Sequence, residues 1–85
     1  MKIIKISALW CPACLITNKA IDKIKEEQNI EVENLDYDLD EDEVKKYNVG
    51  TTLPVLIFMN QDKELFRLIG EKNYEEIMKA VGDVK

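Results

Sequence analysis

Histidine is absent from the 85-residue sequence, and cysteine occurs only twice. A cysteine protease pairs its nucleophile with a histidine base, so the absence of histidine excludes that kind of thiol chemistry. Two cysteines are too few for the multi-bridge scaffold of a small secreted protein. A closed zinc site needs four ligands, so this pair could hold a metal only with carboxylates or with a second chain. The cysteines therefore indicate redox chemistry or metal binding.

Positive charge is scarce, and long apolar runs are missing. The net charge is −5, which disfavours nucleic acids and anionic membranes as partners, because both attract clustered Lys and Arg. No segment approaches the roughly 20 apolar residues of a membrane span. The first residues, Met1 to Ser7, lack the apolar core of a signal peptide. We expect a cytoplasmic protein whose residues 1–85 form a single domain.

The hydrophobic pattern predicts seven elements in the order βαβαββα. Strands are expected where apolar residues alternate or run continuously, and helices where they recur every three to four residues. The predicted strands cover residues 2–7, 30–37, 55–59 and 64–69, with a hairpin turn at 60–63. The alternation of apolar residues changes phase after Val32, which predicts a late start or a bulge in the second strand.

The predicted helix ends rest on capping residues. Pro12 suits the first helical position, which makes Cys11 the N-cap of a helix running to about Gln28. Two further helices are expected where an N-cap residue precedes a Glu by three positions. These capping boxes are Asp40 with Glu43, for a short helix through Tyr47 that Gly50 closes, and Asn73 with Glu76, for the terminal helix.

The segment Trp10-Cys11-Pro12-Ala13-Cys14 stands where a strand ends and a helix begins. Free N–H groups and the helix dipole stabilise an anion there, so we expect Cys11 to be an acidic, nucleophilic thiol. Cys14 lies one turn further on, close enough to attack a mixed disulfide on Cys11 and expel the substrate thiol. The predicted roles are nucleophile for Cys11 and resolving thiol for Cys14, and the two would form a redox disulfide.

The chain resembles the thioredoxin superfamily. The resemblance rests jointly on the Trp-Cys-x-x-Cys motif, on Leu53-Pro54 before a buried strand and on Gly70 before the last helix. It implies an α/β thioredoxin fold, with a four-stranded mixed sheet and helices on both faces. It also implies a cis Pro54 facing the cysteines and a Leu53 backbone that pairs with an extended substrate. The substrate contacts expected on this basis are Trp10, Pro12, Ala13, Leu53, Pro54 and Gly70.

The function implied by this resemblance is that of a thiol–disulfide oxidoreductase. A monomer without a cofactor would reduce or exchange protein disulfides, and a flavoprotein of the thioredoxin reductase type would recycle it. This activity belongs to electron transport and cell redox homeostasis. Two alternatives stay open. One is a glutathione-dependent, glutaredoxin-like enzyme, and the other is a module whose two thiols hold a metal or an iron–sulfur cluster in a dimer.

Lys5 departs from the thioredoxin pattern. Thioredoxins carry a buried Asp six residues before the first cysteine, where it assists proton transfer from the resolving thiol, and Lys5 holds that place here. Either Lys5 points to solvent and water accepts the proton, or the strand register differs.

Overall fold

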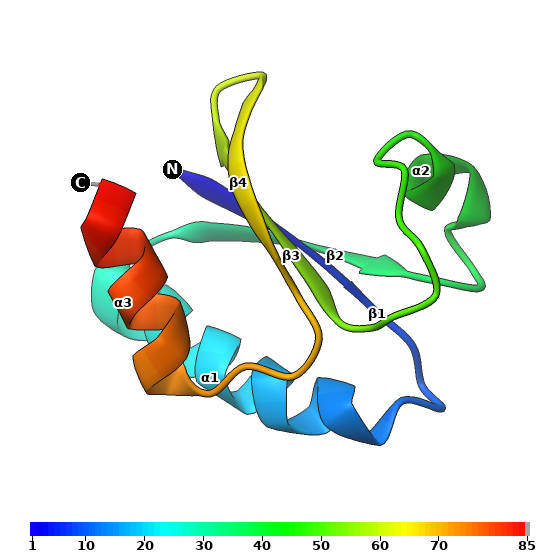
Figure 1. Cartoon of the computed structure of the whole chain (residues 1–85), viewed down its shortest axis with the longest axis horizontal. Helices are drawn as coiled ribbons and strands as arrows, with labels where there is room; N and C mark the ends of the chain where they lie inside the picture. The colour runs from blue at the N-terminus through cyan, green and yellow to red at the C-terminus, as the bar shows by residue number, and fades with distance from the viewer. Residues whose placement is uncertain (85) are drawn as a thin grey trace.

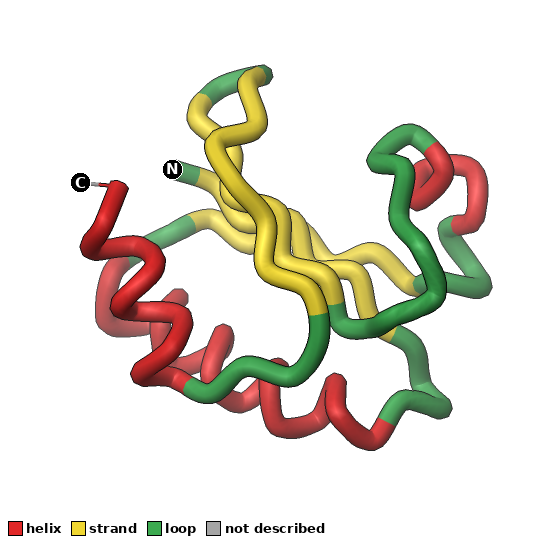
Figure 2. Tube along the Cα trace, viewed as in Figure 1, coloured by secondary structure: helices red, strands yellow, loops and turns green. Residues whose placement is uncertain are grey.

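Four strands form one mixed sheet in the computed structural model, which describes residues 1–84. The strands are β1 (Lys2–Ser7), β2 (Glu31–Asp36), β3 (Val55–Asn60) and β4 (Lys63–Ile69), in the spatial order β2-β1-β3-β4. β1 runs parallel to β2 and antiparallel to β3, and β3 and β4 form an antiparallel hairpin. Figure 2 shows the strands side by side, with the helices around them. The predicted element order and mixed sheet are confirmed.

Helices cover both faces of the sheet. α1 (Pro12–Gln28) and α3 (Tyr74–Val84) lie together on one face, and α2 (Glu41–Lys45) lies on the other (Figure 1). Neighbouring residues of a strand point to opposite faces, so the core has two halves. The half under α1 and α3 includes Ile3, Leu56, Phe58, Ile21, Ile24, Ile77 and Val81. The half toward α2 includes Ile4, Ile57, Leu35 and Val44 and extends to both cysteines.

The predicted limits of α1 are confirmed. Pro12 is the first helical residue, and Cys11 is an N-cap with extended backbone (φ −99°, ψ 105°). Proline loses nothing at this position, because the first N–H groups of a helix have no partner within it. The helix ends at Gln28, after which Asn29 adopts a left-handed conformation with φ 53°. The sequence therefore fixes where the first turn of α1 presents its N–H groups.

The second strand and the short helix differ from the prediction. β2 begins at Glu31, before Val32, and pairs with β1 without interruption, so the change of phase marks neither a late start nor a bulge. Instead, Val32 packs into the half of the core under α1 and α3, and Leu35 packs into the half toward α2. Asp40 is the N-cap residue of α2, as predicted, but its side chain does not form the predicted capping box with Glu43. The Asp40 carboxylate accepts a hydrogen bond from the backbone N–H of Asp36 at 2.8 Å and caps no helical N–H. The helix stops at Lys45, and the left-handed residue after it is Asn48 rather than Gly50.

The capping box of α3 is confirmed. The Asn73 side chain accepts a hydrogen bond from the Glu76 N–H at 2.8 Å, and the Glu76 carboxylate accepts one from the Asn73 N–H at 3.3 Å. Ile77 and Val81 then lie on the face that packs against α1 and the sheet. No helix within residues 1–84 combines the length and the apolar character that a membrane crossing requires.

Candidate active site

The two cysteines lie at the start of α1, just beyond the carboxyl end of the central strand β1. The backbone N–H of Cys11 donates to the carbonyl of Ala8 at 3.2 Å, and that of Cys14 donates to the carbonyl of Cys11 at 3.2 Å. No acidic residue occupies the first turn of α1, so no side chain there competes with a thiolate for the positive end of the helix. Both thiols are free. This is the dithiol, reduced state of the pair.

Burial distinguishes the two sulfurs. Cys11 is 7% exposed, whereas Cys14 is 1% exposed. Burial, and after it the hydrogen bond with Cys11, raise the pKa of the Cys14 thiol to about 11. A backbone hydrogen bond with Ala8 and the charge of Lys5 act in the opposite direction. Cys14 is therefore held as a neutral thiol at physiological pH, behind the more accessible Cys11.

The loop before β3 lies beside the cysteines. Leu53 is buried in the same group of contacting side chains as Ala8, Cys11 and Cys14, and the half-buried Ala13 packs against that group. The Leu53-Pro54 peptide bond is cis, as the resemblance implied. Leu53 thus lies beside the cysteines, where the resemblance implied that its backbone binds an extended substrate. Pro12 is exposed at the start of α1.

Gly70 is tied to the same loop. Its N–H donates to the Pro54 carbonyl at 2.9 Å, and its backbone has φ +92°, a conformation that side chains rarely tolerate. A glycine is needed at this point for the chain to leave β4 and pass Pro54. The structure thus brings five of the expected site residues together around two loops: Cys11, Cys14, Leu53, Pro54 and Gly70.

Trp10 is held in place by residues that follow β2. Its indole N–H donates to the Asp38 carboxylate at 2.7 Å, and its ring meets Tyr37 edge to face at a centroid distance of 6.3 Å. Trp10 nevertheless stays 60% exposed, which agrees with a contact surface. Asp38 was not predicted as a site residue. The predicted topology could have indicated it, because β1 and β2 are parallel neighbours and the segments that follow their carboxyl ends lie at the same end of the sheet.

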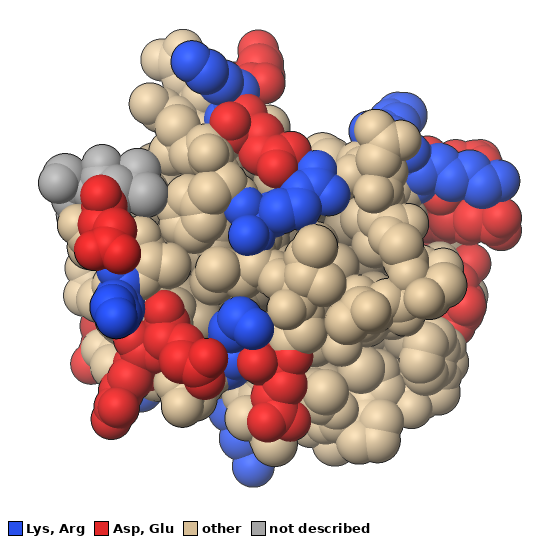
Figure 3. All heavy atoms as spheres, in the orientation of Figure 1, with Lys and Arg blue, Asp and Glu red and all other residues tan. Residues whose placement is uncertain are grey.

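Apolar side chains are exposed around this edge. Leu9, Trp10 and Leu39 line a depression of about 400 Å³ together with Asp36 and Asp38. Leu15 and Ile16 on the first turns of α1 and Ile69 at the end of β4 are also exposed. Figure 3 shows uncharged surface over the end of the molecule where α1 begins. An exposed apolar surface beside a reactive thiol is typical of a protein-binding site.

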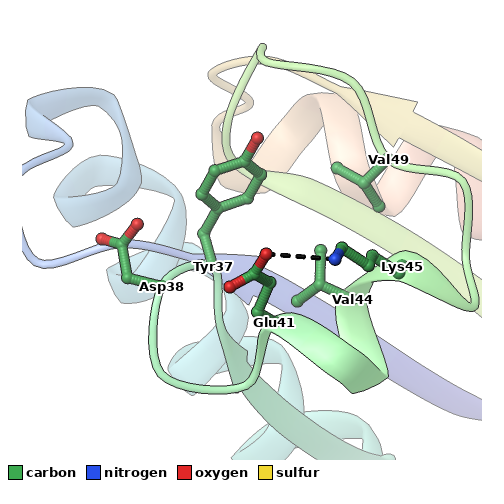
Figure 4. Close-up of a pocket in the computed structure, with 6 residues that line it drawn as sticks. All are labelled: Tyr37, Asp38, Glu41, Val44, Lys45 and Val49. Carbon is green, nitrogen blue, oxygen red and sulfur yellow. Dashed lines mark ion pairs between the residues drawn. The ribbon is translucent and has the colours of Figure 1, made fainter.

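A separate pocket of about 300 Å³ lies between the segment after β2 and α2. Figure 4 shows the Tyr37 ring on one side of it and the Glu41–Lys45 ion pair, 3.2 Å long, at its margin. Neither cysteine lines this pocket. It adjoins the site only through Tyr37 and Asp38, which contact Trp10, so we assign it no part in the chemistry.

Lys5 is buried, so the first of the two alternatives, in which it points to solvent, is wrong. Its exposed fraction is 7%, and in the register it faces Asn34 of β2 and Leu56 of β3. Burial lowers the pKa of the Lys5 ammonium group, while the charges of Asp22 and Cys14 raise it. Lys5 therefore occupies an interior position near the resolving thiol.

Thr17 is a further residue that the sequence analysis missed. It is fully buried on α1, where its hydroxyl donates to the Lys72 carbonyl at 3.2 Å and accepts from the Lys72 N–H at 3.0 Å. This pair fixes the segment after Gly70 against the helix that carries the cysteines. Across residues 1–84, no three His, Cys, Asp or Glu side chains lie together as a set that could hold a metal ion.

The fold and this site define a thioredoxin-fold dithiol protein, the general class of the thiol–disulfide oxidoreductases. A family model described as thioredoxin matches residues 1–83, and the chain belongs to the thioredoxin family. No curated protein matches the chain.

Solved thioredoxin structures agree with this assignment. Fasciola hepatica thioredoxin is 29% identical, with a TM-score of 0.78 over 99% of this chain and 82% of that one. Thioredoxin from Trypanosoma brucei brucei is 25% identical, with a TM-score of 0.84 over 98% and 73%. Thioredoxin 1 from Thermosipho africanus TCF52B shares the fold, with a TM-score of 0.88 over 99% and 93% at 20% identity. The sequence-based resemblance to the superfamily is therefore confirmed.

Proposed function

We propose that this protein reduces protein disulfides through Cys11 and Cys14. The observation that supports this most directly is the asymmetry of the pair. Cys11 stands at the N-cap of α1, whereas Cys14 is buried one turn further on with a pKa of about 11. The Cys11 sulfur can attack a substrate disulfide, and the Cys14 sulfur stays protonated until it resolves the mixed disulfide, as a two-step exchange requires.

The reaction conserves atoms and electrons. The Cys11 thiolate attacks one sulfur of the substrate disulfide, and the other substrate sulfur leaves as a thiol after gaining a proton. Cys14 loses its proton and attacks the Cys11 sulfur, which releases the second substrate sulfur. The substrate gains two electrons, and the protein ends with a Cys11–Cys14 disulfide. A flavoprotein of the thioredoxin reductase type then restores the dithiol.

The substrate surface in this proposal combines the exposed apolar edge with the Leu53-Pro54 loop. Trp10, Pro12 and Ala13 border the nucleophile, and the Leu53 backbone offers an edge to an extended segment. Pro54 and Gly70 hold that loop through their 2.9 Å backbone hydrogen bond. The broad, exposed surface favours a protein over a small thiol as substrate.

Reduction of insulin with dithiothreitol as electron donor tests the chemistry. The wild-type protein is expected to accelerate reduction, and Cys11→Ala is expected to abolish the acceleration. Cys14→Ala, reduced beforehand and then mixed with insulin in the absence of dithiothreitol, is expected to accumulate a mixed disulfide that mass spectrometry detects. The matched control Lys19→Ala changes an exposed residue of the same helix that lies outside the apolar surface, and it keeps both thiols. A wild-type protein without activity, or an active Cys11→Ala variant, would refute the proposal.

The reductant is tested separately. NADPH with a thioredoxin reductase is expected to recycle the oxidised protein, and glutathione with glutathione reductase to do so poorly. The reverse preference would support the glutathione-dependent alternative. Stoichiometric zinc or iron in a dimer as purified would instead support the metal-binding alternative and count against a free dithiol carrier.

A further inference from the structure

Lys5 is a buried cation without an ion-pair partner in the part of the chain that the structure describes. The four ion pairs among residues 1–84 all involve other side chains. Burial of a charged group is costly unless another charge or hydrogen bonds offset it, and lysine lies in the interior only rarely. A lysine that is 7% exposed in the middle of β1 therefore calls for a physical reason.

The groups around Lys5 suggest that reason. Its strand neighbours Asn34 and Leu56 carry no charge. Lys5 lies on the same face of β1 as Ile3, and α1 covers that face. The titratable groups that act on Lys5 come from this helix, and they are Asp22, Cys14 and Lys25. Asp22 and Lys25 have opposite charges that do not change in a redox cycle. Cys14 differs, because it must lose a proton before it can attack.

We propose that Lys5 is a positioning residue for the resolving step, in which its ammonium group stabilises the negative charge that develops on the Cys14 sulfur. This inference rests on the proposed function and names the group that replaces the usual buried acid. An aspartate would take the proton from Cys14 as a base. An ammonium cannot accept a proton, so here the proton passes to water or to the departing substrate thiolate. The Cys14 electron pair forms the new S–S bond, and the Cys11–substrate bond breaks.

The interaction between the two groups is reciprocal. The positive charge of Lys5 lowers the pKa of Cys14, and a negative charge on Cys14 raises the pKa of Lys5. Burial acts against both charged forms, raising the pKa of the thiol and lowering that of the ammonium group. Burial thus disfavours the Lys5 ammonium group and the Cys14 thiolate separately, but each charge stabilises the other when both are present. The pair forms only while Cys14 is a thiolate, which is the reactive state.

Release of a coloured thiol isolates the resolving step. The protein is loaded on Cys11 with 5-thio-2-nitrobenzoate, and the release of this thiol by Cys14 is followed by stopped flow across the pH range. For Lys5→Met, we expect the apparent pKa of release to rise by about one unit, so that release below it is about tenfold slower. Lys5→Arg keeps the charge and is expected to stay close to wild type. Lys25→Met is the matched control, because it removes an equal charge from an exposed position on α1.

Identical pH profiles for wild type, Lys5→Met and Lys25→Met would overturn the inference, as would equal shifts in the two methionine variants. If the wild-type mixed disulfide releases no thiol, the proposed function itself fails. Normal wild-type release with unaffected Lys5 variants would refute only the role of Lys5.

A second measurement needs no Lys5 variant that could fail to fold. The ammonium group of Lys5 is titrated by NMR in the dithiol and disulfide forms of the wild-type protein. Only the dithiol form can place a thiolate at Cys14, which ionises near pH 11. The alkaline end of the Lys5 titration is therefore expected to extend to higher pH in the dithiol form than in the disulfide form. Titration curves that coincide over the whole range would contradict the proposal.

Discussion

Alkaline pH is expected to destabilise the reduced protein through Cys14. An unfolded cysteine thiol ionises near its ordinary pKa of 9.0, whereas Cys14 in the folded protein ionises near 11. Between these values the unfolded chain loses the proton first, and the folded chain retains it. The folded state then binds more protons than the unfolded state, so the free energy of unfolding falls as the pH rises.

The size of the effect follows from the same two values. Each unit of pKa difference corresponds to about 1.4 kcal/mol, so two units correspond to roughly 2.7 kcal/mol. This stabilisation is fully present below about pH 9 and is lost as the pH rises through about 11. The loss is substantial for a small domain, whose total stability is commonly about 5–15 kcal/mol.

Urea denaturation of the reduced protein at a series of pH values measures the effect. Cys14→Ala is the reference, because it keeps every other titrating group, including Lys5, whose lowered pKa changes stability with pH in the opposite direction. The alanine variant should be less stable at neutral pH, where it has lost buried side-chain contacts, but its stability should fall less above about pH 9. Parallel curves for the two proteins would refute the reasoning.

Four substitutions, one of them a control at an exposed residue, test the packing that positions the site, each by urea denaturation. Ile77→Ala empties a fully buried position on α3 and is expected to cost about 2–5 kcal/mol, whereas Leu15→Ala on the exposed side of α1 should change stability by at most about 0.5 kcal/mol. Equal effects would contradict the assigned core. Gly70→Ala should cost about 1 kcal/mol or more because of φ +92°, although the added Cβ would meet only the Thr52 methyl group at 3.9 Å. An unchanged or higher stability would count against backbone strain at this site. Thr17→Val leaves both backbone groups of Lys72 without their partner and should cost about 1–3 kcal/mol, and a neutral effect would show that water replaces the hydroxyl.

Local sequence signals predicted α1, the helix that carries both cysteines, with the correct first and last residues. Proline at the first helical position, a cysteine at the N-cap and apolar residues at helical spacing act within one segment, so they can be interpreted without the rest of the fold. The capping box of α3 is local in the same way, since its two hydrogen bonds join residues three positions apart.

The same capping pattern failed at Asp40 for a physical reason. A carboxylate can accept from any nearby N–H, and the turn after β2 offers Asp36 N–H at 2.8 Å. The Asp36 carboxylate in turn accepts from the N–H groups of Asp38 and Leu39, both at 2.9 Å. The acidic residues Asp36, Asp38 and Asp40 therefore build a tight turn. That turn presents Asp38 to Trp10.

Long-range contacts account for what the sequence could not supply. Thr17 and Lys72 are 55 residues apart, and Trp10 and Asp38 are 28 apart. Neither pair has a periodic pattern or a motif that would mark it. Lys5 illustrates the same limit, because the alternation of lysine and isoleucine in β1 is typical of a strand with one solvated face. The sheet is covered on both faces, so Lys5 is buried.

The burial of Cys14 also sets the order in which an oxidant meets the two sulfurs. A peroxide that arrives from solvent reaches Cys11 first and would convert its thiolate to a sulfenic acid. A sulfenic acid condenses with a neighbouring thiol to form a disulfide, and the Cys14 thiol lies one helical turn away. The product would be the same disulfide that ordinary turnover forms, so the same reductant would restore both. The more deeply buried Cys14 would thus protect the more accessible Cys11 from irreversible oxidation.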